Sequence, residues 1–497
     1  MIVYREQRRR IPTAEAIRRV EAASGFERLM ELGELEAGVA DALCPERDDD
    51  LPPLGALRRG EWRGLDLPRE IEISVPEGFA YYALDPELYR IAARRFAAEC
   101  RPERAAVIGI RSIGATLSAI VEAELAAQGC HTGSWTVRPR GHPWNRHLCV
   151  SGALDHAWRV WDGWFAIVDE GPGLSGSSFA SVAAHLAGLG VPDERIVFFP
   201  SWIPSGAGFV SDAARDRWRC HTKFAAGFEE LGRFREARNL SAGKWRELTG
   251  SPAAVQPQHE RRKYLEGDRL YKFAGYGRYG RAALERAEAL RGWTPETLGL
   301  EDGFLATRWV EGRPAGLSEE LIEHAAAYLT FVRREFATGE TAQTAALAEM
   351  IDVNAGLEVE PGPPAEAIAL DARMLSHEWL ETAGGFLKTD ALEHHDDHFF
   401  PGPQDIAWDV AAFGIEVGGD DYLLDCYVRE SRDASVRARL PFYRTAYLAF
   451  RVGYADLAAQ ALGDCPDGVR FRGEKRRYEA LLGGTPWTMT TANRSSA

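Results

Sequence analysis

The chain has 497 residues, of which 45% are hydrophobic and 27% are charged, values that exclude wholesale disorder. Its length allows about three domains of roughly 150 residues each. The 59 Lys and Arg residues against 74 Asp and Glu residues give a net charge of −15, so the chain is a poor general binder of nucleic-acid backbones, and small molecules are the expected partners.

The sequence carries no membrane or disulfide signature. No run approaches 18 uncharged apolar residues, and the first ten residues, MIVYREQRRR, lack the apolar segment of a signal peptide. The seven cysteines are scattered and form no CxxC pair. Some lie beside a histidine, as Cys220 does beside His221, but none has the usual ligand spacing. We therefore expect a soluble, cytoplasmic protein with reduced thiols and no structural metal site.

Three regions follow one another along the chain. Residues 1–70 have a helical rhythm and predict a helical N-terminal region, either a cap or a dimer contact in a homo-oligomer. Residues 71–250 alternate short apolar runs with helical stretches, which predicts an α/β domain with a parallel sheet. The proline-bearing stretch 249–260 is typical of a linker. Residues 258–497 open with strand-like segments and become mostly helical, which predicts an α+β domain.

An acidic pair and a Gly/Ser-rich loop give the strongest chemical signal of the middle region. The apolar run WFAIV (164–168) predicts a strand, and Asp169 and Glu170 stand at its carboxyl end, where open α/β sheets bind ligands. Glycines and serines then lead into a helix near residue 177, and such a helix start suits a phosphate. Two adjacent carboxylates can hold sugar hydroxyls and a hydrated Mg²⁺.

This pattern resembles the signature with which type I phosphoribosyltransferases bind phosphoribosyl pyrophosphate (PRPP), and the resemblance covers roughly residues 75–205. It implies catalytic roles for Asp169 and Glu170 and a phosphate loop of Leu174, Ser175, Gly176, Ser177 and Ser178. It also implies a pyrophosphate loop with Arg111, Ser112 and Gly114, and a mobile loop with Arg138, Arg140, His142 and Arg146. The extra GPG after the acids departs from the family pattern. The alternative is a strand-to-helix turn without a ligand.

The last region combines a lysine in an apolar strand with an acidic, histidine-rich stretch. Lys272 in LYKFAG could pair with ATP phosphates, and Glu285 or Glu288 of the next helix could orient it. The stretch KTDALEHHDDHFFPGPQDIAWDVA (388–411) contains acids that could hold Mg²⁺ or accept a hydroxyl proton. A zinc site from His394, His395 and His398 is the rival prediction, although the many nearby aspartates favour Mg²⁺.

Residues 258–480 resemble aminoglycoside and choline-type kinases, in a divergent form. The resemblance implies a two-lobed fold, in which Asp390 faces the acceptor hydroxyl and Asp409 is mainly structural. It implies metal binding by Asp405, with Asp396 and Asp397 as competitors, and by His395, which stands where the family has Asn. The spacing from Asp390 to Asp405 is short for the family, and GYGRYG follows Lys272 instead of preceding it.

Together the two resemblances predict a bifunctional enzyme. It would carry out Mg²⁺-dependent phosphoribosyl transfer from PRPP and ATP-dependent phosphorylation of a small-molecule hydroxyl. The departures from the kinase pattern support the alternative, a catalytically degenerate protein that senses nucleotides or PRPP in a regulatory or stress response.

Overall fold

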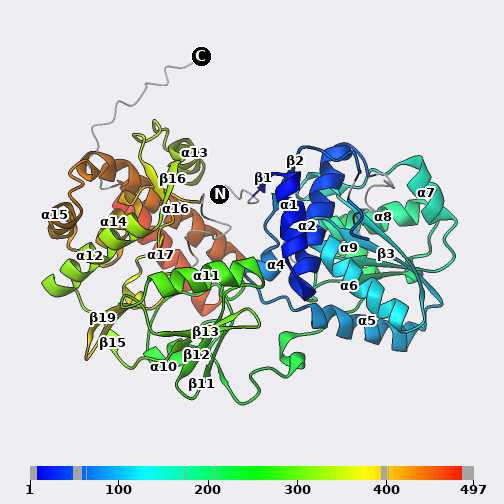
Figure 1. Ribbon diagram of the computed structural model, residues 1–497, viewed down its shortest axis with the longest axis horizontal. Coiled ribbons are helices and arrows are strands. Elements are labelled where there is room, and N and C mark those ends of the chain that lie inside the picture. Colours follow the sequence, from blue (N-terminus) through cyan, green and yellow to red (C-terminus); the bar gives the residue numbers. More distant parts are fainter. Residues whose placement is uncertain are drawn as a thin grey trace. The chain divides into compact units, whose positions relative to one another are not determined.

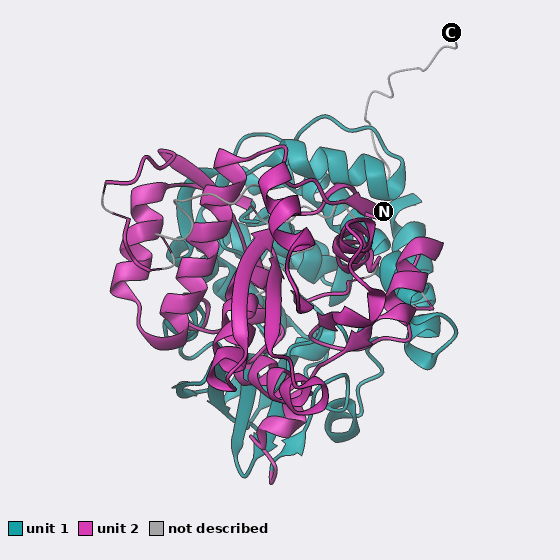
Figure 2. Cartoon of the chain, turned by 90° about the vertical axis from the view of Figure 1, so that its right-hand side faces the viewer, with its two compact units in different colours: residues 1–5, 237–272, 282–497 teal, residues 6–236, 273–281 magenta. Residues whose placement is uncertain are grey.

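The computed structural model describes residues 8–48, 57, 59–62, 64–173, 175–207, 209–392, 394, 400 and 402–483 (Figure 1). The chain is a mixed α/β protein that divides into two compact units (Figure 2). Unit 1 comprises the described residues of 237–272 and 282–497, and unit 2 those of 6–236 and 273–281. These units are not coextensive with the predicted regions, because most of residues 1–70 belong to unit 2 together with the middle region.

A five-stranded parallel sheet organises unit 2, which confirms the predicted parallel sheet. Its strand order is β4-β3-β7-β8-β9. The strands are β3 (Arg104–Ile110), β4 (His131–Val137), β7 (Trp164–Val168), β8 (Ile196–Phe199) and β9 (Thr222–Lys223). The helices are α4 (Glu77–Ala80), α5 (Pro86–Cys100), α6 (Ile113–Ala127), α7 (Gly152–Arg159), α8 (Ser177–Gly188) and α9 (Asp212–Cys220). The central strands are continuous apolar runs because helices bury both faces of such a sheet.

The strand order reverses beside β3. The chain goes from β3 to β4 on one side and then crosses to β7 on the other, and both neighbours pair with β3 in parallel. The switch point therefore lies between the carboxyl ends of β3 and β7, the place where sheets of this type bind ligands.

The N-terminal helices pack on this sheet unit. Strand β1 (Arg8–Pro12) precedes helices α1 (Thr13–Ala22) and α2 (Gly25–Leu43), and it pairs antiparallel with β2 (Glu70–Ser74). At Gly33 the backbone of α2 lies so close to Thr116 of α6 that a Cβ would collide with the threonine side chain. The glycine thus permits tight packing of α2 on α6.

Residues 273–281, which contain the glycine cluster GYGRYG, also belong to unit 2. Arg278 forms ion pairs there with Glu34, at 2.8 Å, and with Glu31. Burial raises the pKa of Glu34 to about 7, although Arg278 opposes the shift. The cluster is therefore held by charge pairing in this unit.

Unit 1 combines an antiparallel sheet with a larger helical part. The sheet order is β10-β11-β12-β14-β13, with β10 (Arg238–Asn239), β11 (Lys263–Glu266), β12 (Arg269–Phe273), β13 (Thr297–Glu301) and β14 (Phe304–Arg308). The helical part has α12 (Glu319–Glu335), α13 (Thr344–Ala355), α14 (Ala407–Glu416), α15 (Asp420–Ser431), α16 (Val436–Leu462) and α17 (Pro466–Gly483). Helix α10 (Arg246–Thr249) precedes the main sheet strands, and α11 (Arg278–Ala289) follows β12.

Short strands precede or separate the helices of this part of unit 1 in the sequence. They are β15 (Arg313–Pro314), β16 (Ala337–Thr341), β17 (Glu366–Ile368), β18 (Trp379–Thr382) and β19 (Gly385–Lys388). β18 and β19 form a hairpin, with β15 beside β18. Buried aromatic residues, among them Trp379, Trp408 and Tyr447, fill the core between the hairpin and the helices. None of the described helices is long and apolar enough to cross a membrane.

Candidate active site

A lysine–aspartate ion pair in unit 1 marks the first candidate site. Lys272 comes from β12 and Asp390 follows the hairpin strand β19. The Lys272 Nζ lies 2.5 Å from Asp390 Oδ1, and the two side chains are 17% and 21% exposed. Burial raises the pKa of Asp390, but the cations Lys272 and Lys263 outweigh it, so its pKa lies well below the usual value. Asp390 is thus an anion that solvent can reach.

A buried cation lies beneath this pair. Lys388 Nζ lies 2.8 Å from Glu378 Oε2 and 3.3 Å from Asp371 Oδ2, and it donates to the backbone oxygen of Asp390 at 2.5 Å. The hydroxyl of Tyr328 donates to Asp371 at 2.8 Å. Burial raises the pKa of Asp371 to about 6, while Lys388 opposes the shift. Lys388 therefore links Asp371 to the segment that carries Asp390.

Helix α14 fixes the loop that begins at Asp371. The buried carboxylate of Asp409 accepts the backbone N–H groups of Asp371, at 3.0 Å, and Ala372, at 2.9 Å. Burial and the neighbouring Asp371 raise the pKa of Asp409 well above its usual value, and these two N–H bonds oppose the shift. This geometry supports the structural role that the kinase resemblance implies for Asp409.

His394 completes the cluster. Its Nε2 lies 3.7 Å from Asp390 Oδ2 and 3.2 Å from Arg373 Nη1. Burial lowers the pKa of His394 well below the usual value, so the ring is neutral and can accept a bond from Arg373. Ligand atoms of Glu378, Asp390 and His394 lie within 4.8 Å of one another. Two carboxylates beside phosphate oxygens suit Mg²⁺, so these residues fit the metal of a nucleotide complex.

The structure separates several residues that the sequence groups together. Asp405 is buried, forms an ion pair with Arg439 and accepts the N–H of Ala407 at 2.9 Å at the start of α14. No described contact joins Asp405 to Asp390, so their short spacing in the sequence does not bring the two carboxylates together. His395, Asp396, Asp397 and His398 lie outside the described residues.

Glu285 and Glu288 lie on the exposed face of α11, whereas Lys272 forms an ion pair with Asp390. The neighbouring residue Arg286 is buried instead and donates to the backbone oxygen of Ala391 at 2.9 Å. Asp390 therefore lies beside Lys272, where the prediction had placed Glu285. The sequence prediction also missed Asp371, Glu378 and Lys388. The only signal for Asp371 was its place after the short apolar run AIAL.

The second candidate site lies at the switch point of unit 2. Gly109 of β3 pairs with Val168 of β7, so the residues that follow these strands come together. Glu170 accepts the N–H of Gly78 at 3.0 Å, and the Tyr89 hydroxyl donates to the backbone oxygen of Asp169 at 2.7 Å. Burial raises the pKa of Asp169 to about 7 and that of Glu170 to about 8. Both acids can therefore change charge near neutral pH.

The predicted phosphate loop leads directly into α8. Gly176 is the N-cap of this helix with φ +63°, and the Phe209 ring occupies the space that a Cβ would need. The hydroxyls of Ser175 and Ser177 lie 2.9 Å apart, and Ser177 also donates to the backbone oxygen of Pro143 at 2.6 Å. Ser178 lies in the first turn, and Leu174 lies outside the described residues. Ser177 is therefore already engaged within the protein.

In the predicted pyrophosphate loop, acids of the N-terminal region neutralise the charge of the arginine. Arg111 is buried, forms ion pairs with Asp48 and Asp41, and donates to the backbone oxygen of Thr136 at 2.9 Å. Ser112 is the N-cap of α6. Gly114 lies so close to Val168 that an added Cβ would stand 2.9 Å from its backbone oxygen. Arg111 is thus already paired within the protein, and its role as a pyrophosphate ligand stays a prediction.

The predicted mobile loop lines a cavity of about 610 Å³ in unit 2. Arg138 pairs with Asp41 at 2.6 Å, and Arg140 with Asp48 at 3.4 Å. The guanidinium of Arg146 donates to the backbone oxygen of Pro139 at 3.4 Å. The cavity is lined by Arg8, Arg10, Arg138, Arg140 and Arg146 among others. Arg146 and Arg138 also lower the pKa of Asp169 against the effect of burial, so positive charge acts on the switch-point acids.

Comparisons with known proteins return kinases of low similarity. Neither a family model nor a curated protein sequence matches the chain. Similar solved structures include a choline/ethanolamine kinase family protein from Mesorhizobium loti, at 17% identity, covering 45% of this chain and 89% of that chain with a TM-score of 0.29.

A second is the GDP complex of aminoglycoside 2'-phosphotransferase-IIIa, at 12% identity, covering 48% of this chain and 96% of that chain with a TM-score of 0.32. A third is a choline kinase from Streptococcus pneumoniae, at 14% identity, covering 44% and 89% with a TM-score of 0.29. Because these TM-scores are low, the similar structures do not assign a function to this chain. A functional assignment has to rest on the contacts of the residues described above.

Proposed function

We propose that unit 1 binds Mg²⁺–ATP and transfers the γ-phosphoryl group to a hydroxyl of a small molecule. The observation that carries this proposal is the solvent-accessible pair of Lys272 and Asp390, set above a loop that Asp409 fixes. Lys272 would pair with the phosphates. Asp390, with Glu378 and His394 beside it, would hold the metal that bridges them.

The proposed roles match what phosphoryl transfer requires of a protein. Such catalysis is mainly positioning and neutralisation of the charge that develops on the phosphoryl oxygens. The Mg²⁺ ion supplies charge neutralisation when it is bound. Lys272 adds a second positive charge from a different element, and Asp409 keeps the backbone of Asp371 and Ala372 in place.

The alternative is a nucleotide sensor without turnover. It is supported by the ion pair of Asp390 with Lys272 at 2.5 Å, because this pair engages the carboxylate that the kinase resemblance directs to the acceptor hydroxyl. ADP release in the presence of candidate hydroxyl compounds distinguishes the two. A transferase releases ADP with phosphorylated product, whereas a sensor binds ATP unchanged.

Replacing Lys272 by Met should weaken ATP binding about ten- to hundredfold, because it removes a charged hydrogen-bond donor to the phosphates. Glu285→Gln is the matched control and should leave the affinity unchanged, since Glu285 is exposed on α11. Calorimetric titration of the full chain with ATP and Mg²⁺ measures both. Equal ATP affinities for Lys272→Met and the wild type would show that Lys272 does not bind the phosphates.

A second candidate function is favoured by the topology of unit 2. We propose that the switch point between β3 and β7 binds a phosphorylated sugar, with PRPP as the compound that the sequence resemblance implies. Asp169 and Glu170 at the end of β7 support a role on the ribose hydroxyls and Mg²⁺. Arg138 and Arg146, which line the cavity of unit 2 and act electrostatically on Asp169, support an anionic ligand.

Mg²⁺-dependent PRPP affinity should rise with pH between about 6 and 9, because both acids have raised pKa values and must ionise to hold the cation. The double variant Asp169→Asn, Glu170→Gln should abolish this binding and its pH dependence. Titration with PRPP at several pH values is the measurement. A double variant that binds PRPP as the wild type does would contradict the assignment.

A further inference from the structure

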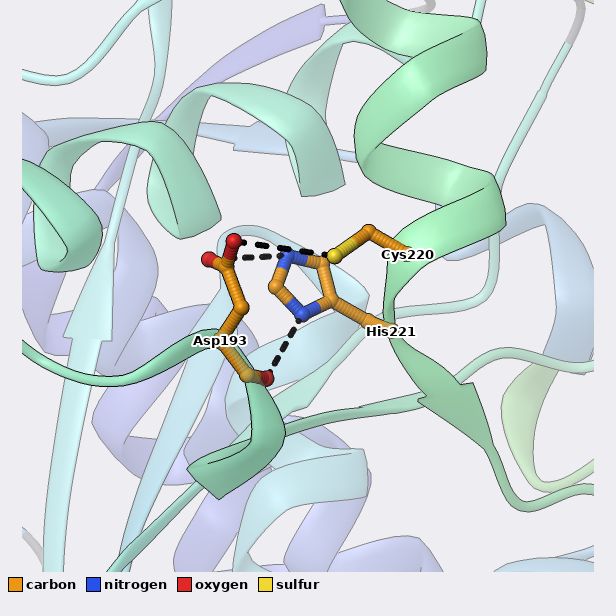
Figure 3. A group of neighbouring side chains, drawn as sticks. All are labelled: Asp193, Cys220 and His221. Carbon is orange, nitrogen blue, oxygen red and sulfur yellow. Dashed lines mark hydrogen bonds and ion pairs between the residues drawn. The ribbon is translucent and has the colours of Figure 1, made fainter.

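Three side chains with metal-binding atoms meet at one edge of the unit 2 sheet (Figure 3). Asp193 opens the short helical turn before β8, Cys220 ends α9, and His221 immediately precedes β9. Because β8 and β9 pair in parallel, with Val197 opposite Thr222, the residues before the two strands lie side by side. The cluster is therefore at the amino ends of the strands, opposite the switch-point site.

The distances in the cluster suit a tetrahedral zinc ion. Cys220 Sγ lies 3.6 Å from Asp193 Oδ2, and His221 Nε2 lies 4.0 Å from Asp193 Oδ1. Zinc bonds of about 2.3 Å to sulfur, 2.0 Å to nitrogen and 2.1 Å to oxygen place S···O neighbours roughly 3.6 Å apart and N···O neighbours roughly 3.3 Å apart. The S···O distance matches, but the two distances run to different oxygens of Asp193. One carboxylate oxygen, the sulfur and one ring nitrogen lie within 4.8 Å of one another, so a closing movement of the side chains brings them to zinc distances.

The orphaned nitrogen of His221 is independent evidence for a ligand. His221 is 2% exposed, and its Nδ1 lies 3.1 Å from the backbone oxygen of Asp193. An Nδ1–H that donates to this carbonyl leaves a lone pair on Nε2, which finds no hydrogen-bond partner among the described residues. Nε2 faces the Asp193 carboxylate (Figure 3). A buried lone pair beside a carboxylate is unfavourable unless a cation lies between them.

We propose that Asp193, Cys220 and His221 bind Zn²⁺, with a fourth position open to solvent. A thiolate, an imidazole and a carboxylate form a donor set typical of zinc, whereas Mg²⁺ and Ca²⁺ prefer oxygen ligands alone. On binding, the Cys220 thiol gives its proton to solvent, and the thiolate and carboxylate balance the two charges of the ion. Arg217 acts as a positioning residue, because its Nη1 holds Asp193 Oδ1 at 2.6 Å and leaves Oδ2 toward Cys220.

The site has a structural consequence for the sheet. β9 has only two residues, Thr222 and Lys223, and forms the edge of the sheet. A zinc ion held by Asp193 before β8 and by Cys220 and His221 before β9 would fasten the start of this short strand. Metal binding that occurs only in the folded state adds directly to stability.

Cobalt provides the test, since Co²⁺ in a thiolate site gives a charge-transfer absorption that Zn²⁺ lacks. The full chain, stripped with a chelator, should show this absorption at one Co²⁺ per chain, and added Zn²⁺ should displace it. Cys220→Ser should lose the absorption and weaken Co²⁺ binding by more than the roughly 10–100-fold that loss of an outer partner costs. Cys149→Ser, which changes another exposed cysteine of unit 2, should retain both.

A second measurement uses the unmodified chain and does not depend on how a variant folds. Zn²⁺ should protect Cys220 from alkylation by iodoacetamide while the exposed Cys149 continues to react, as peptide mass mapping would show. Absence of a cobalt–thiolate absorption in the wild type, an unchanged absorption in Cys220→Ser, or equal alkylation of Cys220 with and without Zn²⁺ would each overturn the proposal.

Discussion

Replacing Asp390 by Asn should lower ATP-dependent phosphoryl transfer by about 10²–10⁴-fold, because the metal contributes several kcal/mol at 1.36 kcal/mol per factor of ten. Asn has nearly the same shape but cannot supply the anionic oxygen that lies 2.5 Å from Lys272 Nζ. The low pKa of Asp390, which Lys272 secures against the effect of burial, keeps this oxygen charged across the neutral range. The rate of ADP release with excess hydroxyl acceptor is the measurement.

The same variant separates the two roles proposed for Asp390. If Asp390 were the acceptor-facing base that the sequence resemblance implies, Asp390→Asn would slow transfer but leave Mg²⁺–ATP binding intact. As a metal ligand, it must weaken binding of the Mg²⁺ complex as well. Glu285→Gln serves again as the control with unchanged rate and affinity. A wild-type rate in Asp390→Asn would exclude both roles.

Replacing Lys388 by Met should destabilise unit 1 by about 3–5 kcal/mol, the usual cost of removing one partner from a buried ion pair. Met fills a similar volume but leaves Asp371 and Glu378 without their common cation. Lys475→Met is the matched control. Lys475 pairs with Asp456 at the surface at 2.9 Å, and a surface pair contributes about 0.2–1 kcal/mol. Urea unfolding measures both changes.

The loss in Lys388→Met should depend on pH. Burial already raises the pKa of Asp371 to about 6 in the folded protein, above its value in the unfolded chain. The folded state therefore binds more protons, and stability falls as the pH rises through this range. Without Lys388 the pKa rises further, so the variant should recover stability in acid and be least stable above about pH 7. A loss that is equal at pH 5 and pH 8 would contradict this account.

Local patterns were sufficient to predict the parallel sheet. The run AAVIGI before a helix and WFAIV before a Gly/Ser loop gave β3 and β7, because strands buried on both faces are continuous apolar runs. Asp169 and Glu170 followed from the rule that ligands bind at carboxyl ends of strands. These inferences need only neighbouring residues. The structure confirms the parallel sheet, whereas the ligand-binding role of Asp169 and Glu170 stays a prediction.

Long-range pairing could not be predicted in the same way. Lys272 meets Asp390 across 118 positions, and Arg111 meets Asp48 across 63. The sequence placed Glu285 near Lys272 only because α11 follows β12, but the helix turns that side chain to solvent. The fold, not the spacing, decides which acid compensates which cation.

The zinc cluster illustrates the same limit. Cys220 and His221 were visible as neighbours, but the spacing rule for zinc ligands gave no third residue. Asp193 joins them only because β8 and β9 lie side by side in the sheet. A two-residue edge strand has no periodicity from which this pairing could be predicted.

The most direct test of the nucleotide site is the Mg²⁺ dependence of ATP affinity, measured by calorimetry with the full chain in Mg²⁺ and in EDTA. Mg²⁺ should tighten ATP binding in the wild type and in Asp405→Asn, because Asp405 pairs with Arg439 outside the cluster. It should have no such effect in Asp390→Asn. A chain that binds no ATP, or an Asp390→Asn variant that responds to Mg²⁺ as the wild type does, would contradict the assignment of Asp390 and Lys272 to a nucleotide site.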